Sequence, residues 1–260
     1  MRTIDSEKTV ARIVGFIRNY ASISNIDSLV VGVSGGVDSA LVSTLCAMTK
    51  LPTFCTTLSM KWYSPGTAAI RARDFLLALK KRYENVSQEG VMLGTANSAI
   101  NISISRSMGT LENLAKANLQ SRLGMRALYA IANSNNGIVV GTGNLVEDYG
   151  VGFFTKYGDG GVDISPIGAL YKSEVYQLAK HVGVPQDILE AAPEDGLWED
   201  GRTDEDQLGV TYGRLEAVME DIRGGKAVSD KEAGKIYDSR HLANKHKMEM
   251  PLVCKIQWEE

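Results

Sequence analysis

Six residues near the N-terminus, SGGVDS at positions 34–39, leave few folds open to this chain. They follow the short β-branched run SLVVG and precede a stretch whose composition favours a helix. A strand, a glycine-rich loop and a helix in this order are typical of a parallel α/β sheet, in which the loop lies at the carboxyl end of the strand. Free backbone N–H groups at the start of the helix, with glycines that allow close approach, predict a site for a phosphate group.

The rest of the chain repeats this alternation of buried strands and amphipathic helices. We expect strands at residues 28–34, 52–60 and 137–144, short extended pieces over 83–105, and helices at 5–21, 38–50, 67–82, 110–135, 170–183, 210–223 and from 229 onward. Residues 141–168 contain eight of the 26 glycines and predict a long, closely packed loop region. We expect Ser229 and Glu232 to form a capping box. The pattern indicates an α/β fold with a doubly wound, Rossmann-like parallel sheet and helices on both faces.

The composition limits the kinds of protein and partner to consider. With 260 residues, 44% of them hydrophobic, we expect a single domain over residues 1–260. The formal net charge of −3 gives no support to nucleic-acid binding through a basic field. No apolar run reaches the length of a membrane span and the N-terminus lacks a signal peptide, so we expect a cytoplasmic protein without a membrane partner. Cys46, Cys55 and Cys254 are too scattered to form a metal cluster.

A carboxylate stands inside the predicted phosphate loop. Asp38 would repel a phosphate unless a divalent cation bridged the two, so we expect Mg²⁺ at this position. Ser34 and Ser39 add hydroxyl donors, and the loop lacks the GxxxxGK[ST] pattern of the mononucleotide P-loop. The simpler alternative is that Ser34, Asp38 and Ser39 only cap a helix. One such residue is enough for a cap, however, and this loop supplies three together with two glycines.

The SGGVDS loop resembles the SGGxDS loop of the ATP pyrophosphatases, which split ATP into AMP and pyrophosphate while they activate an acceptor. The stretch GFFTKYGDGGVDISPIGALYK at 152–172 is more specific. Together with KANLQSRLGM at 116–125, GTGNLVED at 141–148, TDEDQLG at 203–209 and HK at 246–247, it resembles the ammonia-dependent NAD synthetases. The resemblance implies an adenine nucleotide alpha hydrolase-like fold, Mg²⁺ as cofactor, ATP as co-substrate and a homodimer. It also implies a reaction, the amidation of deamido-NAD by ammonia through an adenylated carboxylate, as the last step of NAD biosynthesis.

The resemblance assigns roles to particular residues. Asp38 and Glu147 would hold the metal, while Asp38, Lys172 and Asp159 would be catalytic, Asp159 by holding ammonium and helping to remove its proton. The expected ATP-binding residues are Gly32, Val33, Ser34, Gly35, Gly36, Val37, Asp38, Ser39, Lys61, Thr142, Lys172 and Glu194. The expected deamido-NAD-binding residues are Asn118, Arg122, Phe153, Lys156, Asp163, His246 and Lys247.

Several of these residues have a simpler reading that involves no ligand. The alternatives are an exposed loop position for Glu147, a solvated surface lysine at 172, a solvated helix face for Asn118, Arg122 and Arg126, and local packing for Phe153. Lys172 opens a predicted helix, where the helix dipole disfavours a cation. A phosphate partner would explain its place.

Two positions depart from the family pattern. Glu194, in PEDGLW, stands where the family often has Ser or Thr, so the ATP contact expected there is lost or moved. NLVEDYGVGFF carries one residue more between Glu147 and Phe153 than some relatives have. We also expect the acidic stretch 194–206 to be mobile without ligands and to close over the adenylate.

Two other functions stay open at this point. One is a different ATP pyrophosphatase, such as a transfer-RNA-modifying enzyme, although the acidic balance and the lack of paired cysteines count against it. The other is a nucleotide-binding sensor without turnover, which a turnover assay would separate from an enzyme. A fused glutaminase would need a further domain of roughly 200 residues. We therefore expect free ammonia or a separate glutaminase to supply the nitrogen.

Overall fold

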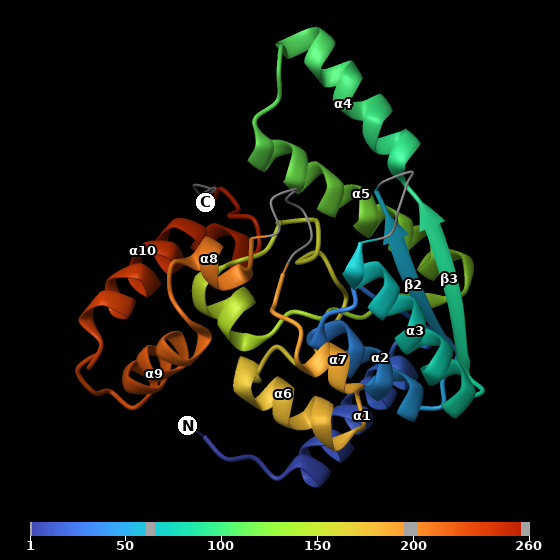
Figure 1. Ribbon diagram of the computed structural model, residues 1–260, viewed down its shortest axis with the longest axis horizontal. Coiled ribbons are helices and arrows are strands. Elements are labelled where there is room, and N and C mark those ends of the chain that lie inside the picture. The colour runs from blue at the N-terminus through green and yellow to red at the C-terminus, as the bar shows by residue number, and fades with distance from the viewer. Residues whose placement is uncertain (1, 61–65, 195–201, 256–260) are drawn as a thin grey trace, which may run out of the picture.

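The computed structural model describes residues 2–60, 66–194 and 202–255 of the chain (Figure 1). The strands are β1 (Ser28–Gly32), β2 (Thr53–Ser59), β3 (Val86–Met92) and β4 (Gly137–Val139). The helices are α1 (Ser6–Ile23), α2 (Val37–Met48), α3 (Thr67–Arg82), α4 (Gly94–Met108), α5 (Asn113–Ser134), the π-helix η1 (Leu145–Val151), α6 (Lys172–His181), α7 (Gln186–Leu189), α8 (Asp204–Leu208), α9 (Tyr212–Arg223) and α10 (Lys231–Met248).

In the described part of the chain the strands form one parallel sheet in the order β3-β2-β1-β4. β1 pairs with β2 on one side, with Leu29 opposite Thr53, and with β4 on the other side, with Leu29 opposite Ile138. The chain thus runs outward from β1 to β3 and returns beyond β1 to form β4. Ligands bind outside the carboxyl ends of the strands at such a change of direction. The prediction of a doubly wound parallel sheet is confirmed.

Helices cover both faces of the sheet, and the strand residues alternate between two cores. Leu29 and Val31 point into a core shared with α1, α2, α3 and α6, whereas Val30 and Val139 pack against α5 on the opposite face. Leu29, Val30 and Val31 are fully buried, so each contributes about 1.5–3 kcal/mol of hydrophobic stabilisation. A strand buried on both faces is an unbroken apolar run, which is why the sequence predicted it.

A smaller apolar cluster lies beside the sheet. It joins η1 to α8, α9 and α10 through Val146, Val151, Leu208, Leu215 and Ala233. Figure 1 shows α8, α9 and α10, in orange to red, on the side of the molecule away from β2 and β3. The cluster holds η1, which follows β4 after a short connection, against the C-terminal helices.

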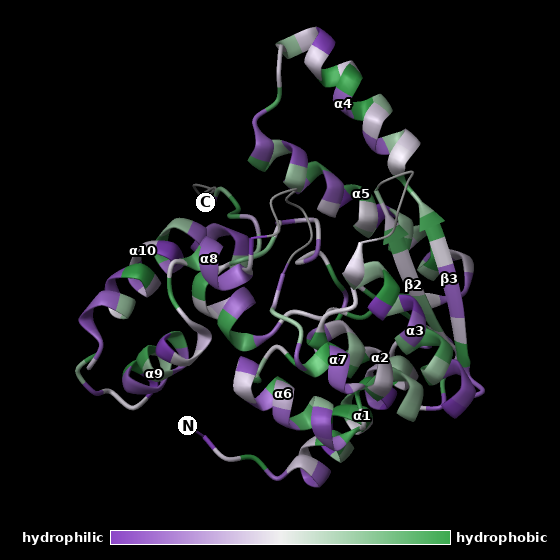
Figure 2. Ribbon diagram, viewed as in Figure 1, coloured by the Kyte–Doolittle hydropathy of each residue, from purple (hydrophilic) through white to green (hydrophobic). Residues whose placement is uncertain are grey.

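The segment 83–105 differs from the prediction of short extended pieces. It holds β3 and most of α4, which projects from the body of the molecule (Figure 1). Its many serines and β-branched isoleucines have a low intrinsic helix propensity, but propensity is a weak guide that tertiary context overrides. Within α4 only Gly94 is buried, and apolar residues (green) alternate with polar ones along the helix in Figure 2.

The start of α10 also differs from the prediction. Its N-cap is Asp230, whose Oδ1 accepts a hydrogen bond from the N–H of Ala233 at 3.0 Å. Glu232 instead forms an ion pair with Arg214 at 2.7 Å. The predicted capping box of Ser229 and Glu232 is wrong, because the carboxylate of the next residue takes the place expected for the hydroxyl.

Three further properties concern the described ranges. None of their helices is both long and apolar enough to cross a membrane. They contain no group of three or more His, Cys, Asp or Glu side chains that could hold a metal ion by themselves. All three cysteines are free, Cys46 and Cys55 in the core and Cys254 on the surface.

Candidate active site

The predicted phosphate loop lies between β1 and α2, and its own hydroxyl groups hold its shape. Ser39 Oγ donates to the carbonyl of Gly36 at 3.0 Å and accepts from the N–H of Ser34 at 3.2 Å. Ser34 Oγ accepts from the N–H of Gly36 at 3.2 Å. The N-cap of α2 is Gly36, with no side-chain cap. Ser34, Asp38 and Ser39 are therefore not the N-cap residue of this helix.

Glycine is required at position 35. Gly35 has φ +89°, and a Cβ atom there would lie 2.2 Å from the carbonyl oxygen of Ala68 on α3. Such a contact is impossible for a side chain, and the left-handed backbone conformation also favours glycine. The loop is thus packed directly against the start of α3.

Asp38, Glu147 and Lys172 meet beside this loop. The ammonium Nζ of Lys172 donates to Asp38 Oδ2 at 2.6 Å and to Glu147 Oε1 at 2.8 Å. The lysine side chain is 4% exposed, and the two carboxylate side chains are 17% and 16% exposed. The cluster carries one net negative charge away from bulk water. Glu147 is therefore not an exposed loop residue, and Lys172 is not a solvated surface lysine.

The cluster shifts the pKa values of its members. Burial alone would lower the pKa of Lys172, but Asp38 and Glu147 raise it above its ordinary value, so the ammonium stays charged. Burial opposes ionisation of Glu147 as well, yet Lys172 and the hydroxyl of Tyr212 lower its pKa. For Asp38 burial prevails over the attraction of Lys172 and raises the pKa. Burial thus raises the pKa of Asp38, whereas the hydrogen-bonded partners of Glu147 lower its pKa.

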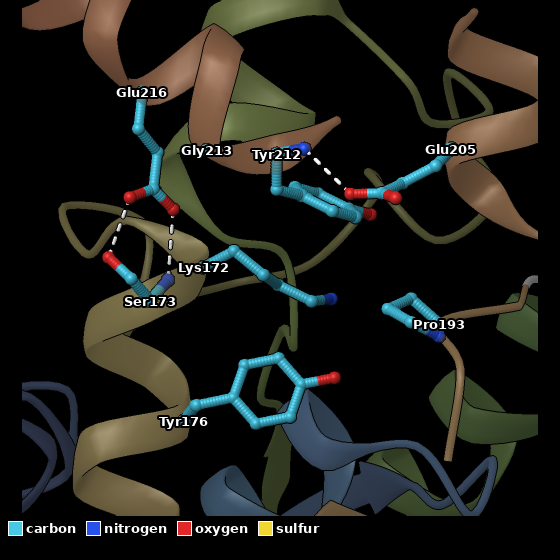
Figure 3. Close-up of a pocket in the computed structure, with 8 residues that line it drawn as sticks. All are labelled: Lys172, Ser173, Tyr176, Pro193, Glu205, Tyr212, Gly213 and Glu216. Atoms are coloured by element: carbon cyan, nitrogen blue, oxygen red, sulfur yellow. Dashed lines mark hydrogen bonds between the residues drawn. The ribbon is translucent and has the colours of Figure 1, made fainter. Parts of the chain in front are cut away.

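Lys172 stands at the first position of α6, where the helix dipole disfavours a cation. Glu216 on α9 lies close by, and its carboxylate accepts from the N–H of Ser173 at 2.9 Å and from its hydroxyl at 2.6 Å, as Figure 3 shows. The side chain of Glu174 accepts from the N–H of Tyr171 at 2.9 Å. The buried carboxylates of Glu216 and Glu174 therefore accept hydrogen bonds from backbone N–H groups at the start of α6.

Two buried residues of the cluster escaped the sequence analysis. Asn144 donates to Asp38 Oδ1 at 3.1 Å, while its own Oδ1 accepts from the N–H groups of Val146 and Glu147. Tyr212 donates its hydroxyl hydrogen to Glu147 Oε1 at 2.6 Å. Asn144 follows a strand and precedes a helical turn, which is an N-cap signal that could have been recognised. Nothing in the sequence around Tyr212 points to Glu147, 65 positions away.

A cavity of about 270 Å³ opens beside the cluster. Figure 3 shows the ammonium of Lys172 and the hydroxyl of Tyr176 directed into the same space, with Pro193 on its far side. The remaining lining residues are Ser173, Glu205, Tyr212, Gly213 and Glu216. Charged and hydrogen-bonding groups thus face an accessible space next to the loop.

The other expected ATP-binding residues have different outcomes. Lys61 and residues 195–201 of the acidic stretch lie outside the described residues. Thr142 is half-buried in the connection between β4 and η1. Glu194 lies beside the phosphate loop, but its carboxylate pairs with Arg71 of α3 at 3.3 Å. The structure therefore places Glu194 near the loop through an arginine that the sequence analysis did not single out.

An unusual helix contains Glu147 and the start of the stretch in which an additional residue is expected. η1 is a π-helix, whose turns are wider than those of an α-helix and take up an additional residue. Glu147 keeps its contact with Lys172, and its carbonyl accepts from the N–H of Phe153 at 2.7 Å at the end of the turn. Asp148 follows directly, and a Cβ on Gly143 would lie 1.8 Å from its carboxylate. The wide turn thus packs the carboxylate of Asp148 against Gly143 while Glu147 contacts Lys172.

The expected dinucleotide residues on α5 contact the glycine-rich loop. Asn118 Oδ1 accepts from the hydroxyl of Thr155 at 2.6 Å, and Arg122 Nε donates to the carbonyl of Lys156 at 3.1 Å. Arg126, one turn further along the same stripe, is exposed. The stripe is thus divided between a part that orders the loop and a part that faces solvent.

Two lysines join this loop to the end of α10. Lys156 Nζ donates to the carbonyl of His246 at 2.5 Å, and Lys247 Nζ donates to the carbonyls of Gly152 and Phe154 at 2.7 and 2.8 Å. The expected residues Lys156, His246 and Lys247 therefore lie together, although they are about 90 positions apart. The ammonium groups of Lys156 and Lys247 contact backbone oxygens, and a ligand would have to replace these oxygens as their partners.

Asp159 and Asp163 are held by different partners. Asp159 Oδ1 accepts from Ser121 Oγ at 2.6 Å, and burial raises its pKa above the ordinary value. Asp163 accepts from the hydroxyl of Tyr129 on α5 at 3.0 Å and from the N–H of Val139 at 2.7 Å, so its two oxygens join α5 to the end of β4. Asp163 therefore has a structural role, and its expected contact with deamido-NAD stays a prediction.

The two phenylalanines of the glycine-rich loop point to different surroundings. Phe153, the expected stacking residue, is half-buried and packs against the cluster of α8, α9 and α10. Phe154 lines a second cavity of about 100 Å³ together with Asp148, Lys247 and Ser165. Phe153 therefore has the local packing considered as its alternative role. Phe154, not Phe153, borders a cavity.

Known proteins match this chain over most of its length. A family model described as NAD synthase matches residues 9–251. The chain is 37% identical to the NH(3)-dependent NAD(+) synthetase of Archaeoglobus fulgidus, over 96% of this chain and 98% of the relative. It is 35% identical to that of Alkaliphilus oremlandii, over 98% and 99%. The solved NMN synthetase of Francisella tularensis matches with a TM-score of 0.84 and 34% identity, over 98% of this chain and 100% of that one.

Proposed function

The chain belongs to the NAD synthase family, and from this premise we propose how its residues carry out the ATP-dependent amidation of deamido-NAD by ammonia. In this reaction the carboxylate of deamido-NAD attacks the α-phosphorus of ATP, pyrophosphate leaves, and ammonia displaces AMP to give NAD. The observation that carries the assignment of the site is the convergence of Asp38, Glu147 and Lys172 beside the phosphate loop. Phosphoryl chemistry depends on positioning and charge neutralisation, and this cluster offers both.

We assign Asp38 and Glu147 as ligands of Mg²⁺. The pair fits this ion because both carboxylates aim at one point, which the ammonium of Lys172 reaches within 2.8 Å of each. Mg²⁺ is commonly held by one or two carboxylates together with substrate phosphates and water. When bound, it would neutralise phosphate charge as pyrophosphate leaves.

The chain's own groups supply the remaining contacts to ATP. The N–H groups of the loop and the hydroxyls of Ser34 and Ser39 hold the pyrophosphate, since a helix N-terminus favours anions. Lys172 provides a fixed positive charge for the charge that develops on the phosphates. Asn144 and Tyr212 keep Asp38 and Glu147 in place.

The acceptor site is assigned to the glycine-rich loop and the two helices that contact it. Asn118 and Arg122 from α5, and His246 and Lys247 from α10, border the loop. Asp159 accepts a proton from ammonium, which cannot attack the adenylate while it is protonated. The raised pKa of Asp159 makes it a stronger base than an ordinary aspartate.

A turnover assay tests this function directly. Incubation with ATP, Mg²⁺, ammonium and deamido-NAD should give AMP and NAD in equal amounts. Asp38→Asn should abolish turnover while its circular dichroism spectrum stays unchanged. Formation of ADP in place of AMP, or near-normal activity of the variant, would contradict the assigned chemistry or the assigned metal ligand.

A second acceptor is favoured by the likeness to the Francisella tularensis NMN synthetase. The acid counterpart of NMN carries the same ring and carboxylate as deamido-NAD and lacks the AMP half. Comparing kcat/KM for the two acceptors decides between them. A larger value for the mononucleotide would make this chain an NMN-forming member of the family.

We also propose that the chain acts as a homodimer. Supporting this, α4 projects from the body (Figure 1), and large apolar side chains on and around it are exposed. They are Met92, Ile102, Met108 and Leu114, which are 58%, 53%, 82% and 62% exposed. A second copy of the chain would cover them.

A further inference from the structure

Arg71 is a cation at the phosphate loop that the mechanism above does not use. It lies on α3 one turn after Ala68, whose carbonyl packs against Gly35. Its Nε donates to the carbonyl of Gly35 at 3.4 Å, and its Nη2 donates to Glu194 Oε1 at 3.3 Å. The arginine side chain is 19% exposed. The guanidinium therefore lies at the edge of the loop rather than out in solvent.

Both contacts of Arg71 are long. Guanidinium–carboxylate bonds of good geometry measure about 2.7–2.9 Å, and other arginines of this chain reach such values. Arg2 contacts Glu174 at 2.6 Å, and Arg214 contacts Asp230 at 2.7 Å. The guanidinium of Arg71 can therefore exchange its present partners for better ones without losing strong bonds.

The charge balance of the site calls for a further cation when a polyphosphate binds. Asp38 and Glu147 share the ammonium of Lys172, so this cluster is negative overall. A polyphosphate at the loop needs positive charge beyond what a shared lysine supplies. Arg71 contacts the loop backbone itself, on the side of α3.

We propose that Arg71 binds the pyrophosphate part of ATP, and that Glu194 holds the guanidinium at the loop edge when this part is absent. The inference rests on the proposed function, because it takes the SGGVDS loop as the pyrophosphate-binding loop. A planar guanidinium can donate to two phosphate oxygens at once. Glu194 then competes with the phosphate for the same donors, which gives a role to a carboxylate that stands where the family pattern has a hydroxyl.

Binding of inorganic pyrophosphate with Mg²⁺, measured by calorimetry, tests the first half of the proposal. Arg71→Ala should weaken binding on the order of tenfold or more, and Arg71→Lys should restore part of it, since lysine keeps the charge but not the fork. The KM for ATP should rise in parallel, with the KM for deamido-NAD unchanged. Arg73→Ala is the matched control, because Arg73 lies on the same helix, is 59% exposed and pairs with Asp74. Equal binding by wild type and Arg71→Ala would overturn the proposal.

The Glu194→Gln substitution tests the second half of the proposal, because it should strengthen pyrophosphate binding rather than weaken it. Removing the competing carboxylate should tighten pyrophosphate binding severalfold in the wild-type background. In the Arg71→Ala background the same substitution should have no effect, because there is no guanidinium left to release. Tightening of equal size in both backgrounds would mean that Glu194 only repels the ligand, and this result would overturn its assigned role.

The outcome also separates this inference from the proposed function. If the wild-type protein binds neither pyrophosphate nor ATP, the phosphate loop itself is wrongly assigned. If the wild type binds and Arg71→Ala, Arg71→Lys and Glu194→Gln bind equally well, the loop assignment stands and the inference about Arg71 fails alone.

Discussion

At the scale of single residues, Lys172 combines two features that are each unfavourable. A buried ammonium loses its hydration, and a cation at the first turn of a helix opposes the dipole. Asp38 and Glu147 offset the first cost, and Glu216 offsets the second by accepting from the N–H of Ser173. A residue kept in such a position has a role in binding or chemistry more often than in folding.

Replacing Lys172 should change metal binding and turnover in opposite directions. Lys172→Met keeps the length of the side chain and changes the charge of the cluster from one negative to two. We expect turnover to fall on the order of 10²–10³-fold, while Mg²⁺ without nucleotide binds more tightly because its competitor is gone. Calorimetric titration at mildly alkaline pH and a steady-state assay measure the two effects.

The control lies at the other end of the same helix. Lys180 is in the exposed last turn of α6, so Lys180→Met should change neither quantity. Weaker Mg²⁺ binding in Lys172→Met than in the wild type would contradict the assignment of Asp38 and Glu147 as ligands.

Arg122 should act on the acceptor rather than on ATP. Its Nε bond to the carbonyl of Lys156 places the guanidinium at the glycine-rich loop. Arg122→Ala should raise the KM for deamido-NAD about tenfold and leave the KM for ATP nearly unchanged. Arg126→Ala, on the exposed continuation of the same stripe, should change neither. Equal effects of Arg122→Ala on both substrates would argue against its placement.

Site residues could be predicted from the sequence where their neighbours in the chain form a recognisable motif. Asp38 belongs to SGGVDS, and Lys172 stands out as a cation at a helix start. Arg71 and Tyr212 belong to no such pattern, since their partners Gly35 and Glu147 are 36 and 65 positions away. Their roles depend on how α3 and α9 pack, which local sequence does not encode.

At the scale of elements, η1 is a wide turn that would accommodate the additional residue expected from the sequence. An insertion in an α-helix would rotate every later side chain, whereas one wide turn absorbs it locally. Asn144 fixes the start of this turn and Gly152, with φ +64°, fixes its end. Such a turn would let Glu147 keep its contact with Lys172 if the connection to Phe153 were longer.

Asn144 links the stability of this turn to the position of Asp38. Asn144→Ala removes the acceptor of two N–H groups and the donor to Asp38, so the free energy of unfolding should fall by about 1–3 kcal/mol. Asn144→Asp keeps the acceptor but places a second carboxylate against Asp38. It should be more stable than Asn144→Ala, yet have low turnover. Urea unfolding and the steady-state assay measure these effects, and full activity of Asn144→Asp would contradict the link.

Prediction of the elements succeeded where periodicity was clear and failed where it was not. β1 was recognised because both its faces are buried. α4 was missed because it buries little, so no apolar stripe marks it. The π-helix was also missed, because glycines 143, 150 and 152 indicated a loop, whereas their small size allows close packing of Asp148, Met219 and Asn244.

At the scale of the whole molecule, the projecting α4 is the feature that a single chain explains least well. Contact of its exposed apolar residues with water is unfavourable, and within the described residues its main helix contact is with α5. A helix with so little buried surface is marginal by itself. Cover by a second copy would stabilise it and would make folding of α4 depend on protein concentration.

A charge on α4 should therefore separate the subunits. Ile102→Lys places an ammonium in the proposed interface, so we expect the dimer dissociation constant, measured by sedimentation velocity over a dilution series, to rise at least about tenfold. Ile23→Lys is the control, because Ile23 is 77% exposed at the end of α1, away from α4. It should leave the dimer intact. A wild-type protein that sediments as a monomer at all concentrations, or a dimer that tolerates Ile102→Lys as well as Ile23→Lys, would show that α4 is not the surface that joins two copies.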